Sequence, residues 1–568
     1  MEIPELRGLI DVALGRSRPE LLIKNARIVN TYTLEVEEGN IAVWQGLIAG
    51  VGDYEEGERL IDAEGLYAVP SFIDSHIHIE STHLLPGEFA RAVVPRGTGA
   101  VIADPHEIAN VLGLAGIRFM IEGSRDLPLD ILYMVPSCVP ASEFESPGAE
   151  LGPEEIEEAL SWEGVLGLGE LMNYPGLLAG DETVLRKLVA AEGRPIDGHA
   201  PFLMGKELNA YIAAGPSTDH ETVVPKIALE KIRRGMVVQI REGSSEHNLK
   251  DLVPLVNERN SCRFMFASDD RSPLDLVREG HMDHILREAV ATGLEPLMAI
   301  RLATLNPAEH YRLGRLGAIA PGRWANLILL KDLKKFEARL VLYHGEIAAE
   351  EGRPLFTPGP VDDEGVRDTV RIKLRYEDLV IPAEEADRPV IELVPAQIVT
   401  ERSVARPKVE GDEAVPDLER DLLKLVLVER HRGSGRVGRA FVRGFGIKRG
   451  ALASSIAHDA HNIVAVGVAD RDIFRAIMRI AELGGGLVVV LDEEILAELP
   501  LPLAGLLSDR PVADVAAALE GLQQAARKLG STLEDPFAPL SFLALSVIPK
   551  LRLTDHGLLD VERCSLID

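Results

Sequence analysis

Eight short apolar segments follow one another between residues 66 and 270, and they constrain the fold of this chain more than any other feature. Their starts lie about 20 to 35 residues apart, and helical patterns such as EEIEEAL and DETVLRKLVAAE fill several of the gaps. The segments are LYAVPSFIDSHIH, GAVIADP, DILYMVPS, GVLGLGEL, RPIDGHAP, GPSTDHE, MVVQIREGS and CRFMFASDD.

Alternation of strand and helix at this spacing is typical of parallel βα units, so the fold class is α/β. Eight such units in succession over roughly 210 residues predict a (β/α)8 TIM-like barrel. An open, doubly wound sheet is the alternative architecture with the same alternation. A chain of 568 residues is too long for one core, so further domains are expected.

Two β-rich segments flank the predicted barrel, which spans residues 66–312. Residues 1–65 contain short alternating apolar stretches separated by Gly and Asn, and residues 313–355 repeat that character. We expect these two segments to pair with each other as a small β domain. The stretch RPLFTPGPVDDEG is rich in Pro and Gly and predicts a linker. Residues 364–568, with mixed α and β patterns, form a predicted C-terminal α+β domain.

Charge and composition exclude some classes of partner. The net charge is −30, which makes nucleic acid and anionic membranes poor partners. No stretch approaches 18 consecutive apolar residues, and the first 20 residues lack the pattern of a signal peptide. The three cysteines, Cys138, Cys262 and Cys564, lie far apart without a CxxC pair. We therefore expect a reduced, cytoplasmic environment.

The first predicted barrel strand ends in an HxH pair. His76 and His78 lie two residues apart, so on a strand they point to the same face and can hold one cation together. An HxH pair alone is a weak signal. Four further residues strengthen it, because each falls at the end of another predicted strand: Glu170, His199, His220 and Asp269.

Barrel enzymes place their reactive groups at the C-terminal ends of the strands. Four imidazoles and two carboxylates at that end could bind two metals, with a carboxylate between them. These ligand types suit Zn, Fe and Mn alike, so the sequence does not select one metal.

The chain resembles the amidohydrolase superfamily and, within it, the adenine deaminases of bacteria and archaea. The segments that carry this resemblance run in order through nearly the whole chain. They are PSFIDSHIHIEST, ADPHEIANVLG, GLGELMNYPG, DGHAP, STDHE, EGSSEHNL, ASDDR, GHMDH, ATLNPAEHY and AHDAHNIVAVG. The resemblance implies hydrolysis of free adenine, a step of purine salvage, by a site with two divalent metals. It assigns His76, His78 and Asp269 to one metal, His199 and His220 to the other, and Glu170 as the bridge.

Adenine deamination needs proton transfer as well as an activated water, because the ring nitrogen beside C6 and the leaving amine must both gain protons. The resemblance suggests Asp269 for this shuttle. Glu221 and His247 are candidates for purine contacts or proton delivery. Their alternative role is a hydrogen bond at the barrel end without a chemical function.

Other polar residues follow the predicted strand ends and are candidates for contacts with the ligands or the substrate. Glu80 lies two residues after the HxH pair, and His83 lies five residues after it. His106 and Glu107 either face the pocket or cap the following helix. Asp270 directly follows Asp269.

The predicted C-terminal domain contains the sequence AHDAHN, with His458, Asp459 and His461. This loop either reaches the barrel mouth and closes the site or forms a surface turn. Gly433 to Gly438 match the pattern GxGxxG, but a dinucleotide site needs a helix at those glycines. The following AFVRGFGIKRG predicts a strand and a turn instead.

Three functions are compatible with the predicted site. The first is deamination of adenine by a homo-oligomer, which we expect to be a dimer. The second is hydrolysis of a cyclic amide, or of another aminopurine or aminopyrimidine, by the same kind of barrel. The third is a protein that retains metal without turnover. A fold does not choose among such reactions, so only the specific segments favour adenine.

Overall fold

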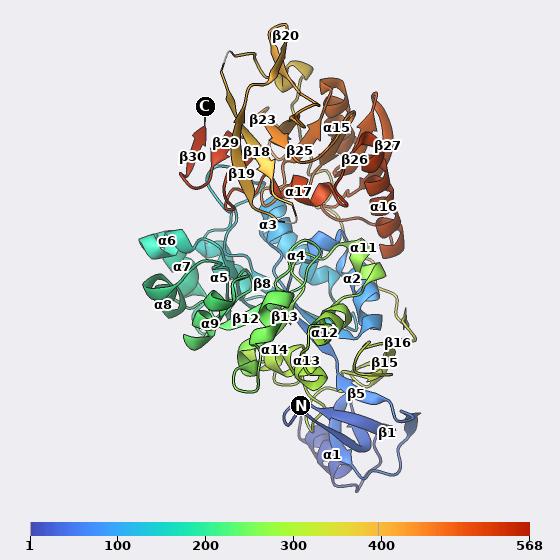
Figure 1. Ribbon diagram of the computed structural model, residues 1–568. Coiled ribbons are helices and arrows are strands. Elements are labelled where there is room, and N and C mark those ends of the chain that lie inside the picture. Colours follow the sequence, from blue (N-terminus) through green and yellow to red (C-terminus); the bar gives the residue numbers. More distant parts are fainter. Residues whose placement is uncertain (1, 385, 396, 568) are drawn as a thin grey trace.

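The computed structural model describes residues 2–384, 386–395 and 397–567. Three regions follow one another along its length. A β-rich region with both the N-terminal segment and strands that follow the barrel lies at one end, the α/β region lies in the middle, and the C-terminal domain lies at the other end (Figure 1).

The middle region is built on parallel strands, as the alternating pattern predicts. These strands form two parallel sheets, with the strand orders β10-β9-β8-β7-β6 and β11-β12-β13. The strands of these sheets are β6 (Phe72–Ile77), β7 (Thr98–Ala103), β8 (Asp130–Val135), β9 (Val165–Leu171), β10 (Ile196–Gly198), β11 (Thr218–Asp219), β12 (Val237–Arg241) and β13 (Phe264–Ala267).

Hydrogen bonds connect the two parallel sheets at both of their edges. The amide of Asp269, just beyond β13, donates to the carbonyl of His76 at 3.0 Å, and the amide of His78 donates back to Asp269 at 3.2 Å. On the other side, the Ser217 amide before β11 donates to Ile196 of β10 at 2.9 Å. The strands therefore follow the course of a TIM-like barrel.

The first predicted strand, residues 66–78, is divided into two strands in the structure. β5 (Tyr67–Pro70) joins the β-rich region, and β6 starts after Ser71 in the parallel sheet. The prediction of one continuous strand is therefore wrong. The carbonyl of Asn326 accepts a hydrogen bond from the Ser71 amide at 3.0 Å, which marks the point where the chain changes partners.

Helices connect the parallel strands and surround them. Their bounds are α2 (Pro86–Val93), α3 (His106–Leu112), α4 (Leu114–Gly123), α5 (Pro153–Leu160), α6 (Tyr174–Ala179), α7 (Glu182–Ala190), α8 (Gly205–Ala213), α9 (Pro225–Arg233), α10 (Leu249–Leu252), α11 (Pro273–Arg278), α12 (Met282–Ala291), α13 (Pro296–Leu302) and α14 (Leu305–His310). Parallel strands covered in this way are buried on both faces, which explains the near-continuous apolar segments of the sequence.

The β-rich region is one mixed sheet with the order β17-β16-β15-β14-β5-β1-β2-β3, and β4 pairs with β1. The antiparallel pair of β5 and β14 joins the strands that precede the barrel to those that follow it. Its other elements are α1 (Ile3–Ala13), β1 (Leu21–Asn30), β2 (Glu35–Trp44), β3 (Leu47–Gly52), β4 (Arg59–Asp62), β14 (Leu327–Leu330), β15 (Ala338–Tyr343), β16 (Glu346–Glu350) and β17 (Arg353–Pro354).

The C-terminal domain centres on a sheet with the order β19-β18-β23-β22-β25-β24-β26-β27. The strands of this sheet are β18 (Arg388–Leu393), β19 (Thr400–Ala405), β22 (Leu423–Val428), β23 (Val437–Arg443), β24 (Ala451–Ser454), β25 (Ile463–Gly467), β26 (Gly486–Leu491) and β27 (Glu494–Pro500). The domain also contains α15 (Asp470–Leu483), α16 (Val512–Leu529), α17 (Phe537–Phe542), β20 (Lys408–Glu410), β21 (Glu413–Val415), β28 (Leu551–Thr554), β29 (Gly557–Asp560) and β30 (Ser565–Ile567).

The C-terminal domain packs directly on the barrel. Helix α16 contacts α11 and α2, and α3 lies where the two regions meet (Figure 1). The GxGxxG segment runs directly into strand β23 rather than into a helix, as its sequence predicts. No helix in the described part of the chain is both long and apolar enough to span a bilayer.

A fully buried ion pair supports the loops after β10 and β11. Lys231 of α9 lies 2.9 Å from Asp219, and it also donates to the carbonyl of Ala200. Asp219 in turn accepts from the amide of Ala200 at 2.8 Å. Both charges are shielded from water, so each depends on the other for compensation.

Replacing Lys231 by Met is expected to leave the Asp219 charge buried and unpaired, which lowers the free energy of unfolding by about 3 kcal/mol. Calorimetry of the full chain should show a lower unfolding temperature for Lys231→Met. Lys226→Met, at an exposed position of the same helix, should match the parent protein. Equal unfolding temperatures for the two variants would contradict this account of the pair.

Candidate metal centre

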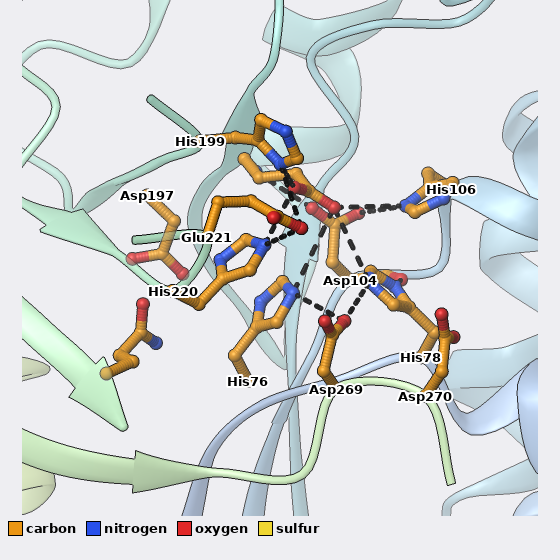
Figure 2. A network of polar contacts seen from close by, with 12 residues as sticks. His76, His78, Asp104, His106, Asp197, His199, His220, Glu221, Asp269 and Asp270 are labelled. Atoms are coloured by element: carbon orange, nitrogen blue, oxygen red, sulfur yellow. Dashed lines mark hydrogen bonds and ion pairs between the residues drawn. The ribbon is translucent and has the colours of Figure 1, made fainter. Parts of the chain in front are cut away.

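Six side chains that the sequence places at strand ends lie together at one end of the parallel strands. Figure 2 shows the side chains of five of them, the four histidines and Asp269, pointing toward a common centre. They come from β6, β9 and the residues just after β6, β10, β11 and β13: His76, His78, Glu170, His199, His220 and Asp269.

Glu170 lies between two groups of imidazoles. Its Oε1 lies 3.4 Å from His78 Nε2 and 3.9 Å from His76 Nε2. Its Oε2 lies 2.7 Å from His199 Nδ1 and 3.2 Å from His220 Nε2. Each carboxylate oxygen therefore serves a different histidine pair, which is the arrangement of a carboxylate that bridges two cations.

Asp269 completes the group on the β6 side. Its Oδ1 lies 3.1 Å from His78 Nε2 and 3.6 Å from His76 Nε2. The backbone of Asp269 has a φ of 59°, in the left-handed region that non-glycine residues rarely adopt. Hydrogen bonds to the strand of His76 and His78 hold this conformation, so the turn that follows β13 fixes the position of the carboxylate.

Burial and mutual attraction shape the ionisation of the cluster. Burial raises the pKa of Glu170, but the His220 and His199 imidazoles outweigh it, and the resulting pKa lies well below the usual range. Burial lowers the pKa of His78, but the carboxylates of Asp269, Asp270 and Glu170 together outweigh burial and raise the pKa well above its ordinary value. For His76 burial prevails, and its pKa falls to about 4.

The donor set fits divalent cations. His76, His78 and Asp269 offer one ligand atom each within 4.8 Å of one another, and so do His199, His220 and Glu221. His76 Nε2 is buried and accepts no hydrogen bond from a described residue. A neutral imidazole nitrogen facing two carboxylates is a donor that Zn, Fe and Mn bind.

Arg241, at the end of β12, joins two carboxylates of the site and was not found by sequence reasoning. Its guanidinium binds Glu221 at 2.7 Å and also donates to Asp269. Burial raises the pKa of Glu221, but Arg241 and the neighbouring His199 and His220 together outweigh burial and lower the pKa from its ordinary value. The only sign of Arg241 in the sequence is its position as a cation at the end of a predicted strand. A charged residue at that position is equally typical of a turn exposed to solvent.

His247 lies apart from the six residues. Its side chain is half exposed, and its Nδ1 contacts Glu242 at 3.0 Å. This contact matches the alternative of a hydrogen bond at the barrel end. Within the described part of the chain, no hydrogen bond or ion pair joins His247 to the cluster around Glu170.

The C-terminal loop with the sequence AHDAHN reaches the barrel through Glu107 of α3. Glu107 Oε1 lies 2.7 Å from His458 Nδ1, and Glu107 Oε2 contacts His461 Nε2. His106 lies between this loop and the cluster, with Nδ1 3.6 Å from Glu170 and Nε2 3.8 Å from Asp459. The loop is therefore buried against the barrel mouth rather than exposed as a turn.

The remaining candidates contact the surroundings of the cluster. Glu80 accepts a hydrogen bond from the Ile108 amide at 3.2 Å, and burial raises its pKa to about 7. Asp270 accepts from the hydroxyl of Ser81. His83 is buried, and its carbonyl accepts from the Ser508 amide of the C-terminal domain at 2.9 Å. These three residues position loops around the site.

Asp104, which the sequence analysis did not identify, accepts a hydrogen bond from the backbone of Glu170. It follows β7, and its Oδ2 accepts from the Glu170 amide at 2.9 Å. The close approach needs glycine at position 169, since a Cβ there would lie 2.1 Å from the same oxygen. The motif GLGEL therefore contains a steric requirement at Gly169 as well as the Glu170 carboxylate.

Comparison with known proteins agrees with this geometry. The model of the Amidohydrolase family matches residues 67–348, and that of the Adenine deaminase C-terminal domain matches residues 397–565. The barrel region thus defines the chain as an enzyme of the amidohydrolase class.

Curated relatives are more specific. The adenine deaminase of Dehalococcoides mccartyi is 48% identical over 563 residues, with 99% of each chain covered. Adenine deaminase 2 of Carboxydothermus hydrogenoformans is 47% identical, again over 99% of each chain. The adenine deaminase of Archaeoglobus fulgidus is 48% identical over 100% of this chain and 98% of its own. The chain belongs to the adenine deaminase family.

Replacing Gly169 by Ala is expected to push Asp104 away from the Glu170 amide and to displace the Glu170 carboxylate. Bound divalent metal, measured by mass spectrometry after reconstitution, should fall by at least half, because Glu170 faces both histidine pairs. The matched control is Gly314→Ala, where a Cβ would meet no atom within 4 Å. Full metal content in a folded Gly169→Ala protein would contradict the role given to this carboxylate.

Proposed function

We propose that this protein hydrolyses free adenine to hypoxanthine and ammonia, a step of purine salvage. The observation that carries the proposal is the position of Glu170 between the two histidine pairs. The relatives named adenine deaminase, which align with the whole chain, support the choice of substrate. Both the barrel and the C-terminal domain take part in those alignments.

The proposed cofactor is a pair of divalent cations, Mn, Fe or Zn. Bound there, they would supply Lewis acidity and lower the pKa of water toward neutrality. The ligands would be His76, His78 and Asp269 for one ion and His199 and His220 for the other, with Glu170 shared between them.

Protein side chains would move the protons of the reaction. We assign the shuttle to Asp269, because its carboxylate lies beside both His76 and His78 and Arg241 keeps it ionised. It would accept a proton from the attacking water and pass it to the ring nitrogen beside C6, and then carry the proton of the new C6 hydroxyl to the leaving amine. Glu221 would orient Arg241 and contact the purine, whereas the position of His247 supports no chemical role.

The C-terminal domain would close the site over the substrate. His458 and His461 would hold the loop to Glu107, and Asp459 would face the pocket beside His106. Closure of this kind excludes water and strengthens the electrostatic interactions inside.

The alternative substrates are a cyclic amide and a different aminopurine or aminopyrimidine. The same metal-ligand pattern serves all of them, but no observation on this chain favours one over adenine. A protein that retains metal without turnover is a poorer account, since the six ligands are intact.

We also propose a division into residues 1–65, 66–312, 313–355 and 364–568, a cytoplasmic location and a homodimer. The pairing of β5 with β14 supports a shared β domain around the barrel. The separated cysteines, none of which forms a disulfide in the described structure, support a reducing location.

The direct test is ammonia release by the full chain reconstituted in turn with Mn, Fe and Zn. Adenine should release ammonia with at least one metal, and kcat/KM should exceed that for adenosine by about 100-fold or more. Dihydroorotate, followed by chromatography because its ring opening releases no ammonia, should give no product. Turnover of dihydroorotate without turnover of adenine would favour the cyclic-amide alternative.

Asp269→Asn tests the proton shuttle within the same assay. The substitution keeps the shape of the side chain but removes its basicity, so kcat for adenine should fall by about 100-fold or more. Glu242→Gln serves as the control, because Glu242 pairs with His247 outside the cluster. A near-normal kcat in Asp269→Asn would remove Asp269 from this role.

A further inference from the structure

Glu246 is a buried carboxyl group without a hydrogen-bond partner. It lies in the loop after β12, in the segment EGSSEHNL, and only 6% of the residue is exposed. Neither Oε1 nor Oε2 accepts a hydrogen bond from any residue that the structure describes. Buried carboxylates in native proteins normally have partners, so a pair of unsatisfied oxygens calls for a functional explanation.

The loop that carries Glu246 is held against the metal centre. The Ser244 amide donates to the carbonyl of Asp270 at 2.8 Å, and the Gly243 amide donates to the carbonyl of Glu246 at 3.0 Å. Four charged groups of the site act electrostatically on the Glu246 carboxyl: Asp270, Arg241, Asp269 and Glu221. The carboxyl group therefore shares the electrostatic environment of the proposed substrate pocket.

Neighbouring carboxylates of the same region are satisfied. Glu242, in the same loop, contacts His247 at 3.0 Å, and Glu221 binds Arg241 at 2.7 Å. Arg241 does not donate to Glu246, because its NH1 and NH2 groups are directed to Glu221 and Asp269 and its Nε has no partner among the described residues. The Arg241 guanidinium thus binds Glu221 and Asp269, and both oxygens of Glu246 remain available to a ligand.

We propose that Glu246 binds the N3 and N9–H edge of the purine and thereby selects the free base. This inference rests on the proposed deamination of adenine, because that reaction requires C6, N1 and the amine to lie at the metals. The opposite edge of adenine presents an acceptor, N3, beside a donor, N9–H. A carboxyl group that accepts from N9–H and donates to N3 matches this edge.

The environment of Glu246 favours its protonated form, which has a hydrogen-bond donor. Burial and the charge of Asp270 raise its pKa well above the usual value, although Arg241 opposes them. A protonated carboxyl offers one donor and one acceptor side by side. Nucleosides lack the N9–H donor, so they would leave one oxygen of Glu246 unpaired and would also need room for a ribose. Recognition by unpaired buried groups is a strong source of discrimination.

The test compares Glu246→Ala and Glu246→Gln with the parent, using Glu242→Gln as the control from the same loop. Each protein is loaded with metal, and its metal content is measured. Titration calorimetry gives Kd for hypoxanthine, which keeps the N3 and N9–H edge, and the ammonia assay gives KM and kcat for adenine. Calorimetric unfolding gives the thermal stability of each variant.

Glu246→Ala should raise Kd for hypoxanthine and KM for adenine by about tenfold or more, with unchanged metal content. Glu246→Gln should stay within about threefold of the parent, because an amide also offers a donor beside an acceptor. Removal of an unpaired buried acid should leave the unfolding temperature of Glu246→Ala unchanged or higher.

Three results would overturn this assignment. They are an unchanged Kd in Glu246→Ala, a clear loss of stability in that variant, and a loss of kcat without a change in Kd in Glu246→Gln. Turnover of adenine by the parent protein distinguishes a failure of this inference from a failure of the proposed function. Without turnover of adenine by the parent the proposed function itself fails, whereas an active parent with an unaffected Glu246→Ala variant removes only the role of Glu246.

Discussion

The structure depends on the interaction of one buried carboxylate, Glu170, with imidazoles on both of its sides. Its two oxygens face different histidine pairs, and its backbone amide is fixed by Asp104. Ionised groups removed from water are costly unless opposite charges compensate them. Divalent cations between these groups would supply that compensation, and the parallel strands bring the groups close enough to share them.

Other buried charges around Glu170 are also compensated by oppositely charged neighbours. Arg241 neutralises Glu221 and Asp269, whereas Lys231 neutralises Asp219 beneath the loops of His199 and His220. On the other side, the charge of Glu107 is met by two histidines of the C-terminal domain. Through this contact the C-terminal domain contributes groups that neutralise and cover a buried acidic side chain at the barrel mouth.

Much of this arrangement follows from periodicity. Alternating strand and helix patterns predict parallel βα units, and residues at the strand ends, such as Glu170 and His220, then meet because such ends lie on one side of a barrel. The division of residues 66–78 at Ser71 could not be predicted in this way, because both halves are apolar and extended. Only the partner strands, β14 for one half and β7 for the other, distinguish them.

Contacts between loops were the part that local patterns could not supply. The pairing of Arg241 with Asp269, the half-exposed position of His247 and the unpaired oxygens of Glu246 all depend on how turns fold over the barrel end. The left-handed backbone of Asp269 could not be predicted from local patterns either, since no residue type in ASDDR requires it. Periodicity selects the strand, but side-chain direction in the following turn is set by tertiary packing.

Anomalous diffraction from crystals of the metal-loaded protein tests the central claim most directly. With data collected on both sides of the absorption edge of the supplied metal, we predict two anomalous peaks, one beside His76, His78 and Asp269 and one beside His199 and His220, with Glu170 in contact with both. Fully loaded crystals without a peak next to Glu170, or with one peak that contacts a single histidine pair, would contradict the account.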